Sequence, residues 1–176
     1  GHSSALSRFL FDKWRAPLVL IVLLFVTSAV YGGYRVTSVW RRLITSERHF
    51  SEENWSEAEK GFKIVAELNR AVNIGFVRDQ YLADWAVLLL KENREEEADS
   101  LLKEIRAVVS DPILVERKIA EIYLRANWWK NAAAVLEDVL DRAIEKEHVV
   151  DMLGLALLKL GDTRRLIELS ENQDRV

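Results

Sequence analysis

The order of apolar and polar residues divides the chain into two parts with different patterns. Residues 16–34 read APLVLIVLLFVTSAVYGGY and carry no charge, and Arg15 and Arg35 bound this run of nineteen residues. A helix of that length spans about 28 Å, close to the hydrocarbon thickness of a bilayer. The pattern therefore predicts a transmembrane helix over residues 16–34, with an exit segment that reaches residue 40.

The sequence also leaves three other interpretations of this run open. A helix buried in a protein core is one, although such helices rarely extend this far without a charge. A cleaved signal peptide is another, because basic residues precede the run and Thr27, Ser28 and Ala29 are small. An amphipathic surface helix is the third, but the run lacks the polar face that such a helix needs. The membrane helix remains our expectation.

Small residues recur at a spacing of four along the predicted membrane helix, where Ser28 is followed by Gly32 and Ala29 by Gly33. Small side chains at this spacing let a second helix approach closely. We therefore predict that Ser28, Ala29, Gly32 and Gly33 pack against a partner inside the membrane. The alternative is that they reflect only the general abundance of small residues in such helices.

Beyond residue 35 the apolar residues recur at steps of three and four, which is typical of amphipathic helices. Asp111 followed by Pro112 predicts a helix start, Asn93 with Glu96 resembles a capping box, and Gly161 predicts a turn. The first helix of this part either continues the membrane helix or follows a break. We expect helices near residues 36–51, 55–70, 76–92, 95–109, 112–126, 128–145, 147–160 and 163–171.

Four segments of similar sequence follow one another in this second part, at residues 52–62, 92–102, 125–136 and 159–169. An alanine holds the same place in the first three and a leucine in the fourth, and these residues lie 40, 34 and 34 positions apart. They are Ala58, Ala98, Ala132 and Leu166.

A period of 34 residues is that of the tetratricopeptide repeat (TPR), and residues 41–172 resemble that superfamily. The resemblance implies antiparallel helix pairs that cross at small residues, such as Ala86 with Ala98 and Ala120 with Ala132. The first repeat departs from the pattern at Ser46, where a smaller residue is usual. Six extra residues near 70–75 lengthen its link to the second repeat.

The expected fold class is all-α, with a single transmembrane helix followed by a TPR-type α-solenoid of about four helix pairs. The expected domain organisation has four parts: a basic N-terminal tail at 1–15, the transmembrane helix and its exit at 16–40, the TPR-like domain at 41–172, and a C-terminal tail at 173–176.

Charge and composition restrict the function. Residues 1–50 carry seven Lys or Arg against two acids, whereas the remaining residues carry 18 basic and 26 acidic side chains. An acidic domain argues against nucleic acid as a partner. The chain has no cysteine, and His2, His49 and His148 share no metal-ligand spacing. No phosphate loop or nucleophile motif is present, so we expect no catalysis, no metal or other cofactor and no small-molecule substrate.

The TPR resemblance implies that the first helix of each pair lines a concave groove that binds peptides or partner helices. Its positions mix apolar residues with scattered charges and lack the Lys/Asn set of repeats that bind acidic termini. This suits an amphipathic segment or another subunit. The alternative is that the leucines simply pack within a short stack. The residues expected in the groove are Gln80, Ala83, Val87, Leu90, Lys91, Leu114, Arg117, Glu121, Leu124, Arg125, His148, Asp151, Leu155, Leu158 and Lys159.

These features together predict a membrane-tethered adaptor or scaffold that binds other protein subunits during assembly or stabilisation of a membrane complex. One alternative is an accessory subunit of an energy-converting or transport complex, held mainly by its membrane helix. Another is an anchored chaperone-like holding factor. We expect a single-pass protein of a bacterial inner (plasma) membrane that contacts the lipid bilayer through residues 16–34. The basic residues are nearly balanced across the span, and we expect the TPR-like domain on the extracytoplasmic side.

Overall fold

A computed structural model describes residues 3–143 and 146–173, and this part of the chain forms eight α-helices and no strand. The all-α prediction is confirmed. For every helix after the first, the observed bounds lie within three residues of the predicted ones. The helices are α1 Ser3–Ser51, α2 Trp55–Val72, α3 Gly75–Lys91, α4 Glu95–Val108, α5 Pro112–Arg125, α6 Trp129–Arg142, α7 Glu147–Leu160 and α8 Thr163–Gln173.

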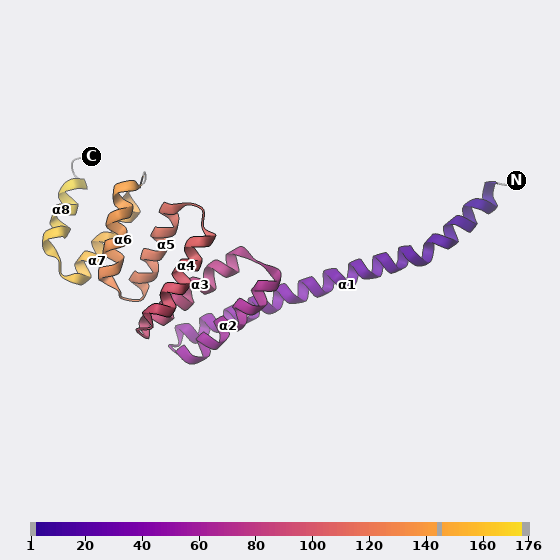
Figure 1. The fold of residues 1–176 in the computed structure, drawn as a ribbon, viewed down its shortest axis with the longest axis horizontal. Helices are drawn as coiled ribbons and strands as arrows, with labels where there is room; N and C mark the ends of the chain where they lie inside the picture. The colour runs from indigo at the N-terminus through magenta and orange to yellow at the C-terminus, as the bar shows by residue number, and fades with distance from the viewer. Residues whose placement is uncertain (1–2, 144–145, 174–176) are drawn as a thin grey trace.

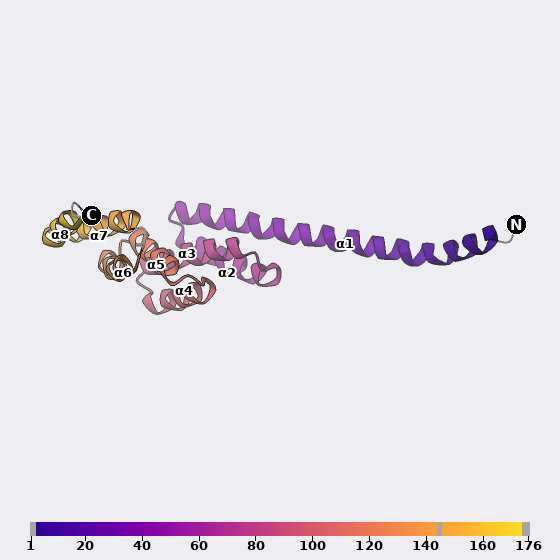
Figure 2. The same cartoon turned by 90° about the horizontal axis from the view of Figure 1, so that it is seen from above.

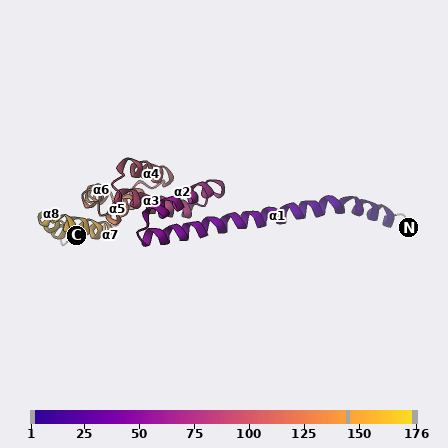
Figure 3. The same cartoon turned by 90° about the horizontal axis from the view of Figure 1, so that it is seen from below.

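Helix α1 is continuous from Ser3 to Ser51, so the predicted membrane segment and the first helix of the second part are one helix. Figure 1 shows α2 to α8 packed into an elongated array, from which the N-terminal part of α1 projects alone. Figure 2 and Figure 3 show the same arrangement from above and from below. The predicted tail at 1–15 is helical from Ser3, and of the predicted tail at 173–176 only Gln173 lies within the described residues.

The projecting part of α1 is apolar and uncovered. Its large side chains between Leu20 and Tyr34 are exposed wherever they are described. Among the described residues, α1 is the one helix long and apolar enough to cross a membrane. Because no other helix that the structure describes covers these side chains, the segment is not a core helix of the array.

From Val39 onwards, α1 packs against the array, and this point lies two residues before the predicted domain boundary. Val39, Leu43 and Ser46 are fully buried against the helices that follow. A Cβ atom added to Gly61 of α2 would overlap the Ser46 hydroxyl and lie 2.9 Å from Ser46 Cβ. Gly61 therefore leaves room for the side chain of Ser46, the residue that departs from the repeat pattern. The two helices cross closely at this point.

The turns inside the helix pairs repeat the same backbone geometry along the chain. Glu53, Asn93, Asn127 and Gly161 have φ angles of 57°, 58°, 66° and 72°. After each, the next residue donates its N–H to the carbonyl five positions earlier, at 2.8, 2.9, 2.8 and 3.0 Å. These left-handed turns lie 40, 34 and 34 residues apart, as the sequence segments do. The prediction for Gly161 is confirmed.

Helix starts agree with the sequence at one position and differ at another. The Asp111 carboxylate accepts hydrogen bonds from the N–H groups of Ile113 and Leu114 at 2.9 and 3.2 Å, which confirms it as the N-cap of α5. The capping box at Asn93 is wrong. Asn93 is the left-handed residue of the turn, and the N-cap of α4 is Arg94, which makes no side-chain cap.

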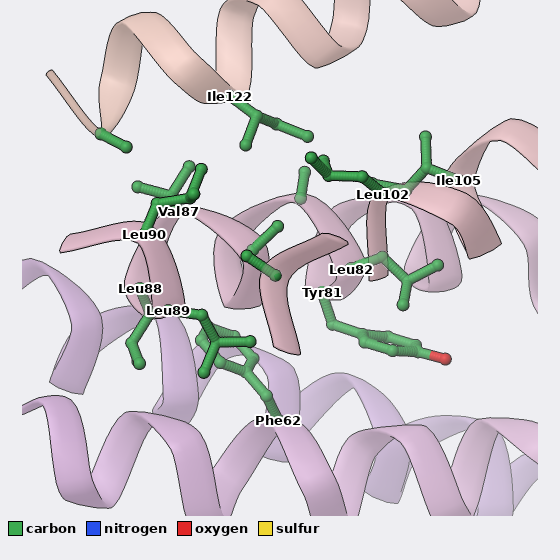
Figure 4. Close-up of a cluster of buried hydrophobic side chains, with 14 of the residues drawn as sticks. Phe62, Tyr81, Leu82, Val87, Leu88, Leu89, Leu90, Leu102, Ile105 and Ile122 are labelled. Atoms are coloured by element: carbon green, nitrogen blue, oxygen red, sulfur yellow. The ribbon is translucent and has the colours of Figure 1, made fainter. Parts of the chain in front are cut away.

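The small residues predicted at helix crossings lie in the core. Ala58, Ala86, Ala98, Ala120 and Ala132 are all completely buried. Larger apolar side chains fill the space around them in two clusters, one spanning α1 to α5 and the other α5 to α8. Figure 4 shows the first cluster, to which Phe62 of α2, Leu89 of α3 and Leu102 of α4 contribute.

Candidate interaction surfaces

The residues predicted to line a groove divide into buried and exposed groups. Val87 and Leu90 are only 1% and 2% exposed, so they belong to the core and no partner can reach them in this fold. Ala83 is buried as well. The physical reason is that α3 contacts α1, α2, α4 and α5, so most of its circumference is covered.

An exposed apolar surface remains on α5 and α7. Leu155 and Leu158 lie one helical turn apart and are 43% and 63% exposed. Leu114 is also exposed, at the start of α5. Leu124 is only half-buried and packs against the second core cluster. Of the apolar residues predicted for a groove, the available ones are therefore Leu114, Leu155 and Leu158.

A polar network joins α1, α3 and α5. Asp84 is 3% exposed, and its carboxylate accepts hydrogen bonds from Arg125 at 2.5 Å and Gln80 at 3.1 Å. The Arg125 guanidinium also lies 5.9 Å from the centre of the Phe50 ring. Burial and the neighbouring Asp84 charge raise the pKa of Glu47, against the opposing effects of Gln80 and Arg125. Predicted groove residues Gln80 and Arg125 therefore hold a buried charge.

Sequence reasoning did not single out Asp84. The signal was present, because this aspartate interrupts the otherwise apolar run YLADWAVLLL. A charge inside such a run is almost never fully buried unless it is paired. The partner could not be read from the sequence, since Arg125 lies 41 positions away.

Other predicted groove charges also contact neighbouring helices. Glu121 lies 3.8 Å from His148 of α7. Lys91 lies at the opposite end of its helix from the α2–α3 turn, 5.3 Å from the centre of the Trp55 ring. Arg117 is half-buried, whereas Asp151 and Lys159 are exposed on α7. The structure thus brings Gln80 and Arg125 together at Asp84 and Glu121 near His148, whereas Ala83, Val87 and Leu90 are buried.

An ion-pair cluster connects the first helix pair to the second. Arg94, in the turn before α4, contacts Glu59 of α2 through two nitrogen–oxygen pairs, each at 2.9 Å. Hydrogen bonds from Arg94 are the main cause that lowers the pKa of Glu59 to about 2. Arg94 also bonds Glu92 and Glu97. This cluster holds neighbouring pairs together and leaves little charge free for a ligand.

A polar cleft of about 520 Å³ lies between α2, α3 and α4, next to the segment with the extra residues. Arg78 Nε and Trp85 Nε1 are buried there and have no hydrogen-bond partner among the described residues. Burial, followed by the charge of Glu104, raises the pKa of Tyr81. In Figure 4 the Tyr81 hydroxyl points away from the apolar side chains. In the sequence, the one feature that pointed to this region was the lengthened link near residues 70–75.

On α1, the small residues predicted to pack in the membrane are not covered by the part of the chain that the structure describes. Ser28, Ala29 and Gly33 are exposed and Gly32 is half-exposed. A Cβ atom on either glycine would meet no atom within 4 Å. This face of α1 therefore has room for another helix.

Comparison with known proteins adds no relative to this geometry. No protein-family model matches the chain, and no curated protein or solved structure matches it significantly. Function is therefore inferred from the chain's own surfaces.

Proposed function

We propose that this protein is a membrane-tethered adaptor, in which a TPR-type α-solenoid binds other subunits of a membrane protein complex. The observation that carries the proposal is the shape of α1. Its N-terminal part exposes a continuous apolar surface, and its C-terminal part lies in the core of the helical array. A bilayer is the environment that such an exposed apolar helix requires.

The repeated turns support the TPR-type part of the proposal. Four left-handed residues at spacings of 40, 34 and 34 give the helix pairs equivalent connections. Stacked pairs of this kind form extended surfaces suited to protein binding. Leu155 and Leu158 supply an exposed apolar contact on that surface, and tethering raises its effective concentration near membrane partners.

The proposal has further parts. The array acts through binding and not through catalysis, with protein subunits as partners. The location is a bacterial inner (plasma) membrane, with the array on the extracytoplasmic side. If the apolar N-terminal part of α1 were instead a cleaved signal peptide, the mature chain would begin within α1, after the small residues Thr27, Ser28 and Ala29. The mass of the protein recovered from its native membrane tests this directly.

A second candidate is an accessory subunit held mainly through its membrane helix. One observation favours it, namely the uncovered face at Gly32 and Gly33, where another helix has room to approach. In that case the array would add little to recognition.

A pair of variants separates the two candidates. Leu155→Asp with Leu158→Asp removes the exposed apolar contact of α7, and Gly32→Leu with Gly33→Leu blocks close approach to α1. The adaptor proposal expects the α7 variant to lose its partners severalfold in quantitative co-purification from native membranes in mild detergent. The circular dichroism spectrum should stay unchanged, because both leucines are exposed.

Ile167→Asp is the matched control, since Ile167 is an exposed apolar residue of α8. It should retain the partners. Retention of the partners by the α7 variant, together with their loss in the glycine variant, would replace the adaptor by the accessory subunit.

A further inference from the structure

Three large apolar side chains stay exposed where the array meets the free part of α1. Trp40 and Ile44 lie one turn apart on α1, and Phe76 lies in the first turn of α3. The Trp40 and Phe76 ring centroids are 5.9 Å apart. Phe76 is 65% exposed, although the middle of its helix is almost entirely buried. Trp40, Ile44 and Phe76 are called the apolar edge below.

The turn that presents Phe76 is held in place. The Asn69 side chain accepts a hydrogen bond from the Ile74 N–H at 2.9 Å and donates one to the Ile74 carbonyl at 3.2 Å. Asn73 adopts a left-handed conformation, with φ 52°, and donates its N–H to the Asn69 carbonyl at 2.6 Å. Asn69 itself is buried. The exposure of Phe76 is therefore a property of a fixed turn.

The α2–α3 turn faces the side from which the membrane segment leaves the array. Figures 1, 2 and 3 agree that this turn is the part of the array lying furthest along α1 towards its N-terminus. Helices α1 and α3 run in the same direction, and helical side chains lean towards the N-terminus of their helix. The side chains of Trp40 and Phe76 therefore lean towards the membrane segment.

The distance along α1 matches the thickness of a lipid headgroup layer. Trp40 follows Tyr34 by six residues, which is about 9 Å of helix. Headgroups extend roughly 5–8 Å beyond each face of the hydrocarbon core. With residues 16–34 in that core, aromatic side chains that lean back from Trp40 and Phe76 reach the headgroups.

The charges around the apolar edge fit a phospholipid surface. Arg41 and Arg42 are exposed beside Trp40, and Arg70 is exposed in the last turn of α2. The nearest acid in α3, Asp79, lies 3.4 Å from Lys118. Aromatic rings flanked by arginines are typical of segments at a membrane–water interface.

We propose that the apolar edge inserts into the headgroup layer of the bilayer that α1 crosses, so that the α2–α3 turn is a second membrane contact of this chain. This inference rests on the membrane tether proposed above. A second contact fixes the tilt of α1 and the direction in which the array faces, neither of which a single span determines by its length.

A depth measurement on the full chain tests this contact. The chain has no cysteine, so a spin label can be attached at Gly75→Cys, where an added Cβ would meet no atom within 4 Å. Labels at Leu24→Cys and Ile167→Cys serve as references for lipid and water. The proteins are reconstituted in nanodiscs of phosphatidylcholine and phosphatidylglycerol. Collision with oxygen, which concentrates in lipid, is compared with collision with a water-soluble nickel chelate.

We expect the oxygen-to-nickel ratio at Gly75 to be severalfold higher than at Ile167. Adding Phe76→Asp should lower it to the Ile167 value while the circular dichroism spectrum stays unchanged. Leu114→Asp, which alters an exposed apolar residue of α5, should leave the ratio at Gly75 unaffected.

Three results would overturn the inference, and they differ in what else they affect. If the label at Gly75 lies in water while the label at Leu24 lies in lipid, the second membrane contact is refuted and the tether is retained. If the label at Leu24 lies in water, the membrane tether is refuted as well. A Gly75 label shielded from both reagents means that a second copy of the chain covers the apolar edge instead of lipid.

Discussion

The two parts of α1 carry similar apolar residues and place them in opposite surroundings. Leu24 in the first part is 61% exposed, whereas Leu43 in the second part is 1% exposed. The helix itself does not change between them, because its backbone runs unbroken from Ser3 to Ser51. What changes is the neighbouring structure, because α2 and α3 cover the second part and no described residue outside α1 covers the first.

The small residues of α1 show the same difference. Gly33 has open space around it, whereas Ser46 packs against Gly61 of α2. A single leucine or small residue therefore does not by itself distinguish a membrane segment from a core segment. The distinction depends on whether the rest of the chain supplies a complementary surface, and three experiments examine it.

The largest effect is expected from removing the uncovered part. Deletion of residues 1–34 should abolish carbonate-resistant membrane association and leave the array folded, because Val39 and the buried residues after it are retained. Sedimentation with vesicles, alkaline carbonate extraction and circular dichroism measure the two properties separately. Carbonate-resistant association of the shortened chain would show that the tether lies elsewhere.

Truncation of one leucine in each part gives the next effect. Leu43→Ala removes a buried side chain and should lower the free energy of unfolding by about 2–5 kcal/mol. Leu24→Ala should leave it unchanged, because Leu24 touches no part of the array core. Chemical denaturation of both variants in mild detergent measures this difference. Equal losses of stability in the two variants would contradict the proposed division of α1.

A smaller effect is expected from glycine substitutions. Gly61→Ala should reduce the free energy of unfolding by about 1–3 kcal/mol, since its Cβ would overlap Ser46 and force the helices apart. Gly33→Ala meets no neighbour and improves helix propensity, so stability should be unchanged or rise by about 0.5–1 kcal/mol. Thermal unfolding followed by circular dichroism compares them. A Gly61 variant as stable as the parent would mean that α1 and α2 do not cross closely there.

Much of the fold could be predicted because the relevant signals are local. Apolar periodicity and turn residues fixed the helices after the first to within three residues. The spacing of Ala98 and Ala132 matched that of the structural turns at Asn93 and Asn127. The Asn93 capping box failed because an asparagine also tolerates a left-handed conformation. Here it ends one helix instead of starting the next.

The candidate site could be predicted only in part, because exposure depends on contacts between distant segments. Val87 and Leu90 hold groove positions by analogy, yet neighbouring helices bury both. Leu155 and Leu158 lie closer to the end of the array and remain exposed. The pairing of Asp84 with Arg125, and the place of Phe76 beside Trp40, join residues far apart in the sequence. No local pattern encodes such pairs.

Because α1 is unbroken, the face that carries Gly32 and Gly33 has a fixed angle about the helix axis relative to the array. Gly32 and Gly33 lie on the same helix as Val39 and Leu43. The direction in which the two glycines face therefore depends on the direction in which the array faces. Each residue inserted between Gly33 and Val39 would turn one relative to the other by about 100° and lift the array by about 1.5 Å. Insertion of about seven residues, or two turns, would nearly restore the direction. The length of helix between Gly33 and Val39 therefore determines the direction in which the array faces and, for the proposed tether, its height above the bilayer.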